Sequence, residues 1–127
     1  STIIISETVW DMGAYFRGVD AYEKSLRKVL NVGLKGTERV IWFKLHKLHR
    51  EHPLCREDPR CYETNKPEKE EKFREIGVRV ARESGAEIFD TYGVTNTTFS
   101  ALDGPDAVHY FNTTTGVELD ILLNMIC

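Results

Sequence analysis

The sequence has no apolar run that approaches the roughly 20 residues needed to cross a bilayer. Its first residues, STIIISETVWD, lack the basic start and the long apolar stretch of a secretory signal peptide. Lysine and arginine form no long run, and with a formal charge of -3 the clustered positive charge that binds nucleic acid is missing. We therefore expect no nucleic-acid partner and no membrane span in this chain.

The residues that are present are typical of a globular domain. With 41% hydrophobic and 29% charged residues, the chain has enough apolar side chains to form a core, unlike a disordered chain. A length of 127 residues suits one domain and is short for two, and the chain contains no internal repeat. We expect a single domain that spans residues 1–127.

Two of the three cysteines, Cys55 and Cys61, flank a short segment, CREDPRC. Pro59 and the acidic residues favour a turn that can bring the two sulfur atoms within bonding distance. The sequence thus predicts a local disulfide, with two free surface thiols as the alternative, because spacing alone does not establish connectivity. Cys127 is left as a free thiol or as the partner of a cysteine outside this chain.

Two N-glycosylation sequons are present, at Asn96 and Asn112, and both fall in segments typical of a loop or a helix start. Together with a disulfide they favour a secreted protein or one in the lumen of the endoplasmic reticulum or Golgi. The alternative is a cytosolic chain in which the same residues only form turns and helix caps.

The first half of the chain alternates strand, helix and strand. The run TIIIS, residues 2 to 6, predicts a strand buried on both faces. Apolar residues at helical spacing between Val19 and Leu30 predict a helix of about three turns, with Gly33 and Gly36 beyond its end. RVIWFKL, residues 39 to 45, predicts a second strand, and the polar, proline-punctuated segment after it is typical of a surface excursion.

The second half continues the alternation. Pro67 and the acidic residues after it predict a helix start, and Gly85 predicts its end. AEIFDTYG, residues 86 to 93, predicts a third strand, and a last helix is expected from about Thr114 to Ile126. This order predicts an α/β fold, a three-layer parallel sheet flanked by helices, with its functional site in the loops beyond the carboxyl ends of the strands.

The histidines His46, His49 and His52 recur every three residues, which raises the question of a zinc site. On a strand this spacing directs side chains to opposite faces, and no carboxylate nearby in the sequence orients the rings. We expect no metal site here and assign the segment to a solvated or substrate-facing loop.

Asp106 and His109 form the strongest catalytic candidate. A carboxylate that fixes the tautomer of a histidine and stabilises its imidazolium makes that histidine a general base near neutral pH. Gly104 and Pro105 form the turn before this pair, and the last helix follows it. In the alternative interpretation Asp106 only caps that helix and His109 is packed.

Two stretches resemble the SGNH (GDSL-type) hydrolases, most closely the PC-esterase branch. DGPDAVHY, residues 103 to 110, is similar to the last block of the family, an Asp-x-x-His element before a terminal helix. IIISETVWDMG, from residue 3, resembles the third block of that branch, where a strand ends at Gly-x-Trp-Asp or Gly-x-Asn-Asp. The resemblance implies that His109 is the base, that Asp106 orients it, and that the segment beside the oxyanion hole comprises Thr8, Val9, Trp10 and Asp11.

The chain departs from this family in two respects. The serine nucleophile of the family stands in a Gly-Asp-Ser block, which these residues do not contain, so we expect a domain that is incomplete at its N-terminus and needs a preceding segment. Thr8 and Trp10 stand where many relatives have Gly and Asn, so the asparagine donor to the oxyanion is missing. The indole N–H of Trp10 is a donor, but its bulk fits packing or an acyl pocket equally well.

The resemblance implies the C-terminal part of an SGNH-like serine esterase or O-acyltransferase. Its substrate would be an acyl ester of a glycan or a related hydroxyl compound, and no cofactor is implied. The alternative is a non-catalytic, glycosylated binding module, luminal or secreted, that keeps the fold.

Overall fold

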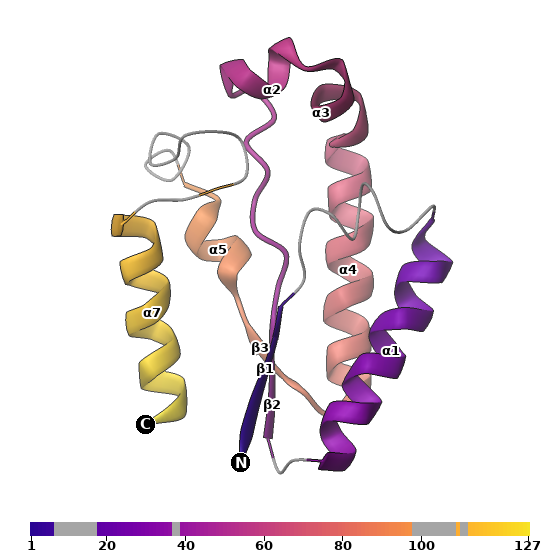
Figure 1. Cartoon of the computed structure of the whole chain (residues 1–127), viewed down its shortest axis with the longest axis vertical. Helices are drawn as coiled ribbons and strands as arrows, with labels where there is room; N and C mark the ends of the chain where they lie inside the picture. Colours follow the sequence, from indigo (N-terminus) through magenta and orange to yellow (C-terminus); the bar gives the residue numbers. More distant parts are fainter. Residues whose placement is uncertain (7–17, 37–38, 98–108, 110–111) are drawn as a thin grey trace. The chain divides into compact units, whose positions relative to one another are not determined.

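The computed structural model describes residues 1–6, 18–36, 39–97, 109 and 112–127 (Figure 1). Contacts divide the chain into two compact units, Ser1–Leu45 with Pro67–Phe89 and His46–Lys66 with Asp90–Cys127. The elements follow in the order β1 (Thr2–Ser6), α1 (Val19–Gly36), β2 (Arg39–Phe43), α2 (Pro53–Glu57), α3 (Pro59–Thr64), α4 (Pro67–Ser84), β3 (Glu87–Phe89), α5 (Thr91–Thr95) and α7 (Asn112–Ile126).

The first unit is built on a parallel sheet with the strand order β1-β2-β3. Because each strand lies next to its predecessor, both connections run in the same direction across the sheet. Right-handed connections then place both connecting helices on one face. Accordingly α1 and α4 pack against each other and lie side by side in Figure 1.

The core of the first unit lies between these helices and β2. Val40 and Trp42 of β2 lie against α1 and α4 and are fully buried. Ile41, which points to the opposite face because side chains alternate along a strand, is fully buried too. The rings of Tyr22 from α1 and Phe73 from α4 meet with centroids 4.8 Å apart. The sheet flanked by helices confirms the fold class predicted from the sequence.

The expectation that β1 is buried on both faces is wrong for the described residues. Ile3 and Ile4 are 39% and 45% exposed, and only Ile5 within the strand is half-buried. β1 is the edge strand of the three-stranded sheet. A short apolar run can form either a central strand or an edge strand, so the sequence pattern alone could not show which of the two β1 is.

The predicted end of the first helix is also wrong. Gly33 and Gly36 lie within α1, which continues through Gly36. A Cβ on Gly33 would stand 3.4 Å from Ile5 Cδ1 and 3.4 Å from Val40 Cγ2. Gly33 therefore lies inside the helix where α1 packs on β1 and β2, and it does not mark the end of the helix.

An ion-pair network joins α1 to α4 on their exposed side. Arg79 donates to both carboxylate oxygens of Glu23, at 3.1 and 2.8 Å, and Arg27 donates to Glu23 at 2.8 Å. Arg27 also pairs with Glu83 at 2.5 Å. Hydrogen bonds from Arg79 and then Arg27 lower the pKa of Glu23 from 4.5 to about 2.

Among the described residues, the second unit contains α2, α3, α5 and α7. α5 packs against α7, and Thr91, Thr95 and Thr114 are buried there. Thr95 Oγ1 donates to the Thr91 carbonyl at 2.8 Å and accepts from the Lys47 backbone N–H at 2.8 Å, which ties the segment after β2 to α5. None of the described helices combines the length and apolar character that crossing a bilayer requires.

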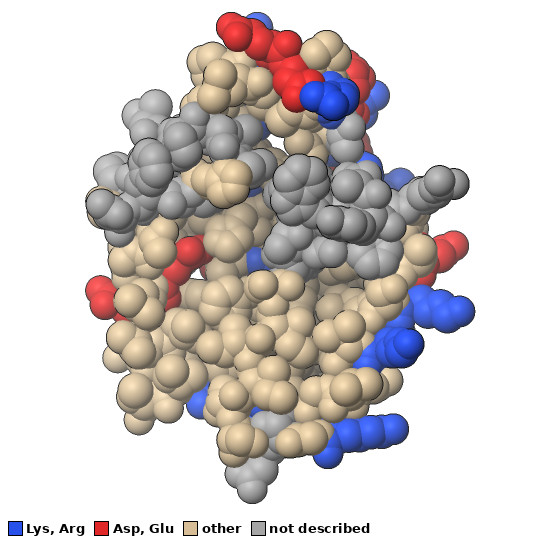
Figure 2. Space-filling view, viewed as in Figure 1, with Lys and Arg blue, Asp and Glu red and all other residues tan. Residues whose placement is uncertain are grey.

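The surface excursion predicted between the second strand and the long helix contains two short helices. α2 and α3 each begin with a proline, and the side chains of His52 and Asp58 cap them. Both acidic and basic side chains are seen at the top of Figure 2. Within this segment Arg56 lies 3.8 Å from Glu51 and Arg60 lies 3.6 Å from Asp58, so it presents charge of both signs.

Candidate active site

The three strands of the first unit end at the same level. Ser6 pairs with Phe43, and Phe43 pairs with Phe89, so the last residues of β1, β2 and β3 align across the sheet. The backbone N–H of Lys44 donates to the Phe89 carbonyl at 3.0 Å, so the hydrogen bonding between β2 and β3 extends one residue beyond the end of β2. In parallel sheets this edge is where functional loops gather.

The sequence places both predicted catalytic segments after such strand ends. Thr8, Val9, Trp10 and Asp11 follow β1, and they lie outside the described residues. Asp106 follows β3 in the chain and also lies outside the described residues. His109 is described: its side chain is exposed, it belongs to no helix or strand, and α7 begins shortly after it at Asn112.

The three histidines spaced three apart have separate surroundings within the second unit. His46 Nε2 lies 2.9 Å from Glu118 Oε1, His49 Nε2 lies 3.0 Å from the Thr95 carbonyl oxygen, and His52 Nδ1 accepts from the Leu54 backbone N–H at 3.3 Å. Among the described residues, no group of three or more histidine, cysteine and acidic side chains is arranged to hold a metal ion.

The pair of His46 and Glu118 corrects one step of the sequence argument, which found no carboxylate close enough to orient these rings. Glu118 comes from α7, and its side chain is 14% exposed while that of His46 is 30% exposed. The pairing brings together residues distant in the chain, so no local pattern signalled it. It attaches the segment after β2 to α7 through an imidazole–carboxylate contact of the kind that fixes ring orientation.

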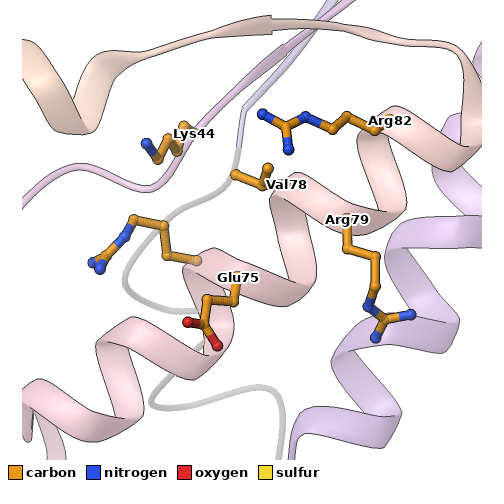
Figure 3. A pocket seen from close by; sticks show the side chains of 6 residues that line it. Lys44, Glu75, Val78, Arg79 and Arg82 are labelled. Atoms are coloured by element: carbon orange, nitrogen blue, oxygen red, sulfur yellow. The ribbon is translucent and has the colours of Figure 1, made fainter.

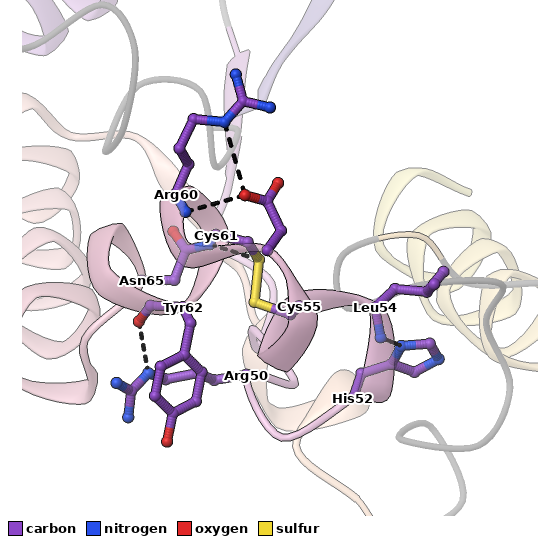
Figure 4. Close-up of a disulfide and its surroundings, with 9 residues drawn as sticks. Arg50, His52, Leu54, Cys55, Arg60, Cys61, Tyr62 and Asn65 are labelled. Carbon is purple, nitrogen blue, oxygen red and sulfur yellow. Dashed lines mark hydrogen bonds and ion pairs between the residues drawn. A yellow bond between two sulfur atoms is a disulfide. The ribbon is translucent and has the colours of Figure 1, made fainter.

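The disulfide between Cys55 and Cys61 is present, as predicted (Figure 4). It links α2 to α3 across a sequence separation of 6 residues. Arg50 supports the same region, because its Nε donates to the Tyr62 carbonyl at 2.8 Å and its guanidinium lies 3.6 Å from the centre of the Tyr62 ring. The cross-linked segment is therefore an ordered part of the second unit, while Cys127 is a free, exposed cysteine.

The candidate glycosylation residues are both in described segments. Asn96 is exposed and lies directly after α5, where its backbone N–H donates to the Tyr92 carbonyl at 2.8 Å. Asn112 is the first residue of α7.

Comparison with solved structures identifies similar folds. A lipase/acylhydrolase from Enterococcus faecalis matches with a TM-score of 0.67 at 12% identity, over 96% of this chain and 59% of that chain. LAE5, an alpha/beta hydrolase enzyme from the metagenome of Lake Arreo, Spain, matches with a TM-score of 0.67 at 16% identity, over 97% of this chain and 58% of that chain. No family model and no curated protein sequence matches the chain.

The chain therefore has a hydrolase-like α/β fold, as these neighbours do. It spans less than two thirds of the length of either neighbour. At such low identity the likeness concerns the fold, and chemistry has to be argued from residues of this chain.

Proposed function

We propose that the chain is the C-terminal part of one SGNH-like domain, of the PC-esterase type, that acts as a serine esterase or O-acyltransferase. The observation that carries the proposal is the position of the Asp-x-x-His element. It stands between β3 and the last helix in a hydrolase-like fold, and the side chain of His109 is exposed. A general base has to come within hydrogen-bonding reach of the hydroxyl that it deprotonates, and an accessible imidazole can do this while a histidine enclosed by packing cannot.

In the proposed mechanism His109 is the general base. It takes the proton from the hydroxyl of a serine as the serine oxygen attacks the acyl carbon, and it returns that proton to the departing alkoxide. Asp106 would orient the ring and stabilise the imidazolium. The acyl group is then transferred from the serine to water in an esterase or to another hydroxyl in an acyltransferase.

The proposed mechanism also needs a nucleophilic serine and donors to the oxyanion. The serine would come from a Gly-Asp-Ser block in a segment preceding these 127 residues. Backbone or side-chain donors among Thr8, Val9, Trp10 and Asp11 would face the developing oxyanion, since this segment leaves β1 at the edge where the strands end together. We propose acyl esters of glycans or related hydroxyl compounds as substrates, and a secreted or luminal location.

The test is replacement of His109 in a protein that carries this chain together with the serine block. His109→Ala should lower the turnover of an acetyl ester by at least about a hundredfold, because loss of a general base removes that much or more. Asp106→Asn should also lower turnover while substrate affinity is kept. Both variants need an unchanged circular dichroism spectrum.

His52→Ala is the matched control, because it removes a histidine of the second unit whose ring caps α2. It should keep the parent turnover. Near-parent turnover in His109→Ala with the fold intact would refute the catalytic role and favour a non-catalytic binding module.

A further inference from the structure

The first unit contains an open pocket of about 350 Å³ beside α4 (Figure 3). Its lining comprises four cationic side chains, one carboxylate and one apolar side chain, namely Lys44, Arg74, Arg79, Arg82, Glu75 and Val78. Cationic side chains outnumber the carboxylate in this lining. An anion bound there would meet a surplus of positive charge.

The spacing along α4 explains how the cations come together. Arg74, Val78 and Arg82 recur every four residues, so they lie along one stripe of the helix, with about 12 Å between the outer two Cα atoms. Val78 is half-buried and gives an apolar contact between the two arginines. In Figure 3, Arg82 extends from α4 toward Lys44, on the same side of the helix as Val78.

Lys44 faces this stripe from the end of β2. Its backbone N–H is fixed by the Phe89 carbonyl at 3.0 Å, so its position is set by the sheet and not by a loose loop. The pocket therefore has one cationic residue whose backbone is held at the carboxyl edge of the sheet, and others on the helix that covers the sheet. Rigid elements on two sides are suited to hold a ligand in one orientation.

The arginines differ in how their charge is compensated. Arg79 is held by Glu23 through two hydrogen bonds of 3.1 and 2.8 Å, which raise the pKa of its guanidinium. In Figure 3 it extends away from Lys44. Arg82 is exposed, and within the part of the chain that the structure describes it forms no ion pair. Arg82 is thus the side chain best placed to engage an added anion.

We propose that this pocket binds a tetrahedral oxyanion carried on a small organic group, that is, a phosphate or sulfate monoester. The guanidinium of Arg82 would form charge-assisted hydrogen bonds to two oxyanion oxygens, and the ammonium of Lys44 would add a third contact. The volume lies at the lower end of the ~300–1,000 Å³ typical of small-molecule sites. It leaves room beyond a bare oxyanion for a carrier that contacts Val78. The site is independent of the proposed ester chemistry.

Isothermal titration of the protein that contains this chain tests the proposal, with four probes: inorganic phosphate, inorganic sulfate, glucose 6-phosphate and glucose 6-sulfate. We expect saturable binding of at least one monoester at constant ionic strength. If a monoester binds more tightly than its free anion, the pocket recognises the organic group as well as the oxyanion. Arg82→Gln should weaken binding by about tenfold, the effect of losing a charge-assisted hydrogen bond.

Lys72→Gln is the matched control, because it removes the same charge from an exposed position of α4 outside the pocket lining. It should leave the affinity unchanged, and both variants should keep the parent melting temperature. The proposal is overturned if no probe binds beyond the effect of potassium chloride at equal ionic strength. It is equally overturned if Lys72→Gln weakens binding as much as Arg82→Gln. Binding would then depend on the overall positive charge of α4 and not on a site in the pocket.

Discussion

At the scale of single residues, Gly77 sets how closely α4 approaches the sheet. A Cβ built on Gly77 would stand 2.5 Å from Trp42 Cζ2, 2.6 Å from Trp42 Cη2 and 2.9 Å from the Tyr22 hydroxyl. All three distances are shorter than non-bonded contacts allow, and the indole of Trp42 is fully buried. Because the indole is enclosed by the core, it has no free space into which it could move.

The first prediction follows from that contact. Gly77→Ala should lower the free energy of unfolding by about 1–2 kcal/mol, because overpacking costs more than the roughly 1 kcal/mol that alanine gains over glycine in a helix. Gly116→Ala in α7 is the control, since its Cβ would meet no described atom within 4 Å. That variant should be as stable as the parent or more stable. Urea unfolding of the two variants measures both changes, and a Gly77→Ala protein at least as stable as the parent would contradict this account.

At the scale of elements, the network of Glu23, Arg27 and Arg79 makes the pairing of α1 with α4 sensitive to acid. The pKa of Glu23 is about 2 in the folded chain and close to 4.5 without its partners. A lowered folded pKa means that ionised Glu23 stabilises the fold fully above pH 4.5. That stabilisation is lost as the pH falls from 4.5 toward 2.

Glu23→Gln tests this dependence. The difference in the free energy of unfolding between the parent and the variant should be constant from about pH 7 down to the unfolded pKa and then shrink as acid is added. Urea unfolding across this range measures it, and added salt should reduce the difference because the pairs are in partial contact with solvent. A difference that does not change with pH would show that Glu23 acts by packing alone.

The sequence predicted the strands and the long helices of the fold, and it missed the short helices α2, α3 and α5. α4 was readable because Pro67, the acidic first turn and Gly85 mark its two ends, and Gly85 indeed has a φ of 82°. α5 replaced the end of the expected third strand. Asp90 could have indicated the start of α5, because its side chain caps the helix by accepting from the Gly93 backbone N–H at 3.0 Å. This cap was missed because Asp90 lies within the stretch assigned to the third strand.

At the scale of the whole molecule, only those candidate site residues that lie close together in the sequence could be predicted from it. Asp106 and His109 stand three residues apart, so a pattern can propose them together. The contact of His46 with Glu118 and the convergence of Lys44 on the α4 stripe depend on tertiary packing. No spacing rule contains that information, because partners from different elements have no fixed separation in the chain.

The last prediction concerns where the molecule is made. The disulfide between Cys55 and Cys61 fits an oxidising compartment, and the exposed Asn96 lies in a sequon directly after a helix end. We expect that the protein expressed in a secretory eukaryotic host carries an N-linked glycan on Asn96. Intact-mass measurement before and after treatment with an N-glycosidase detects it.

Two substitutions separate this glycan from one on Asn112. Asn96→Gln should remove the glycan on Asn96 while any glycan on Asn112 is kept, and Thr98→Ala should act in the same way, because it destroys the sequon without changing the asparagine. Agreement of the two variants assigns the modification to the sequon and not to a change in folding. If the parent protein loses no mass with the glycosidase, the luminal location is contradicted, and Asn96 acts only as the residue that ends α5.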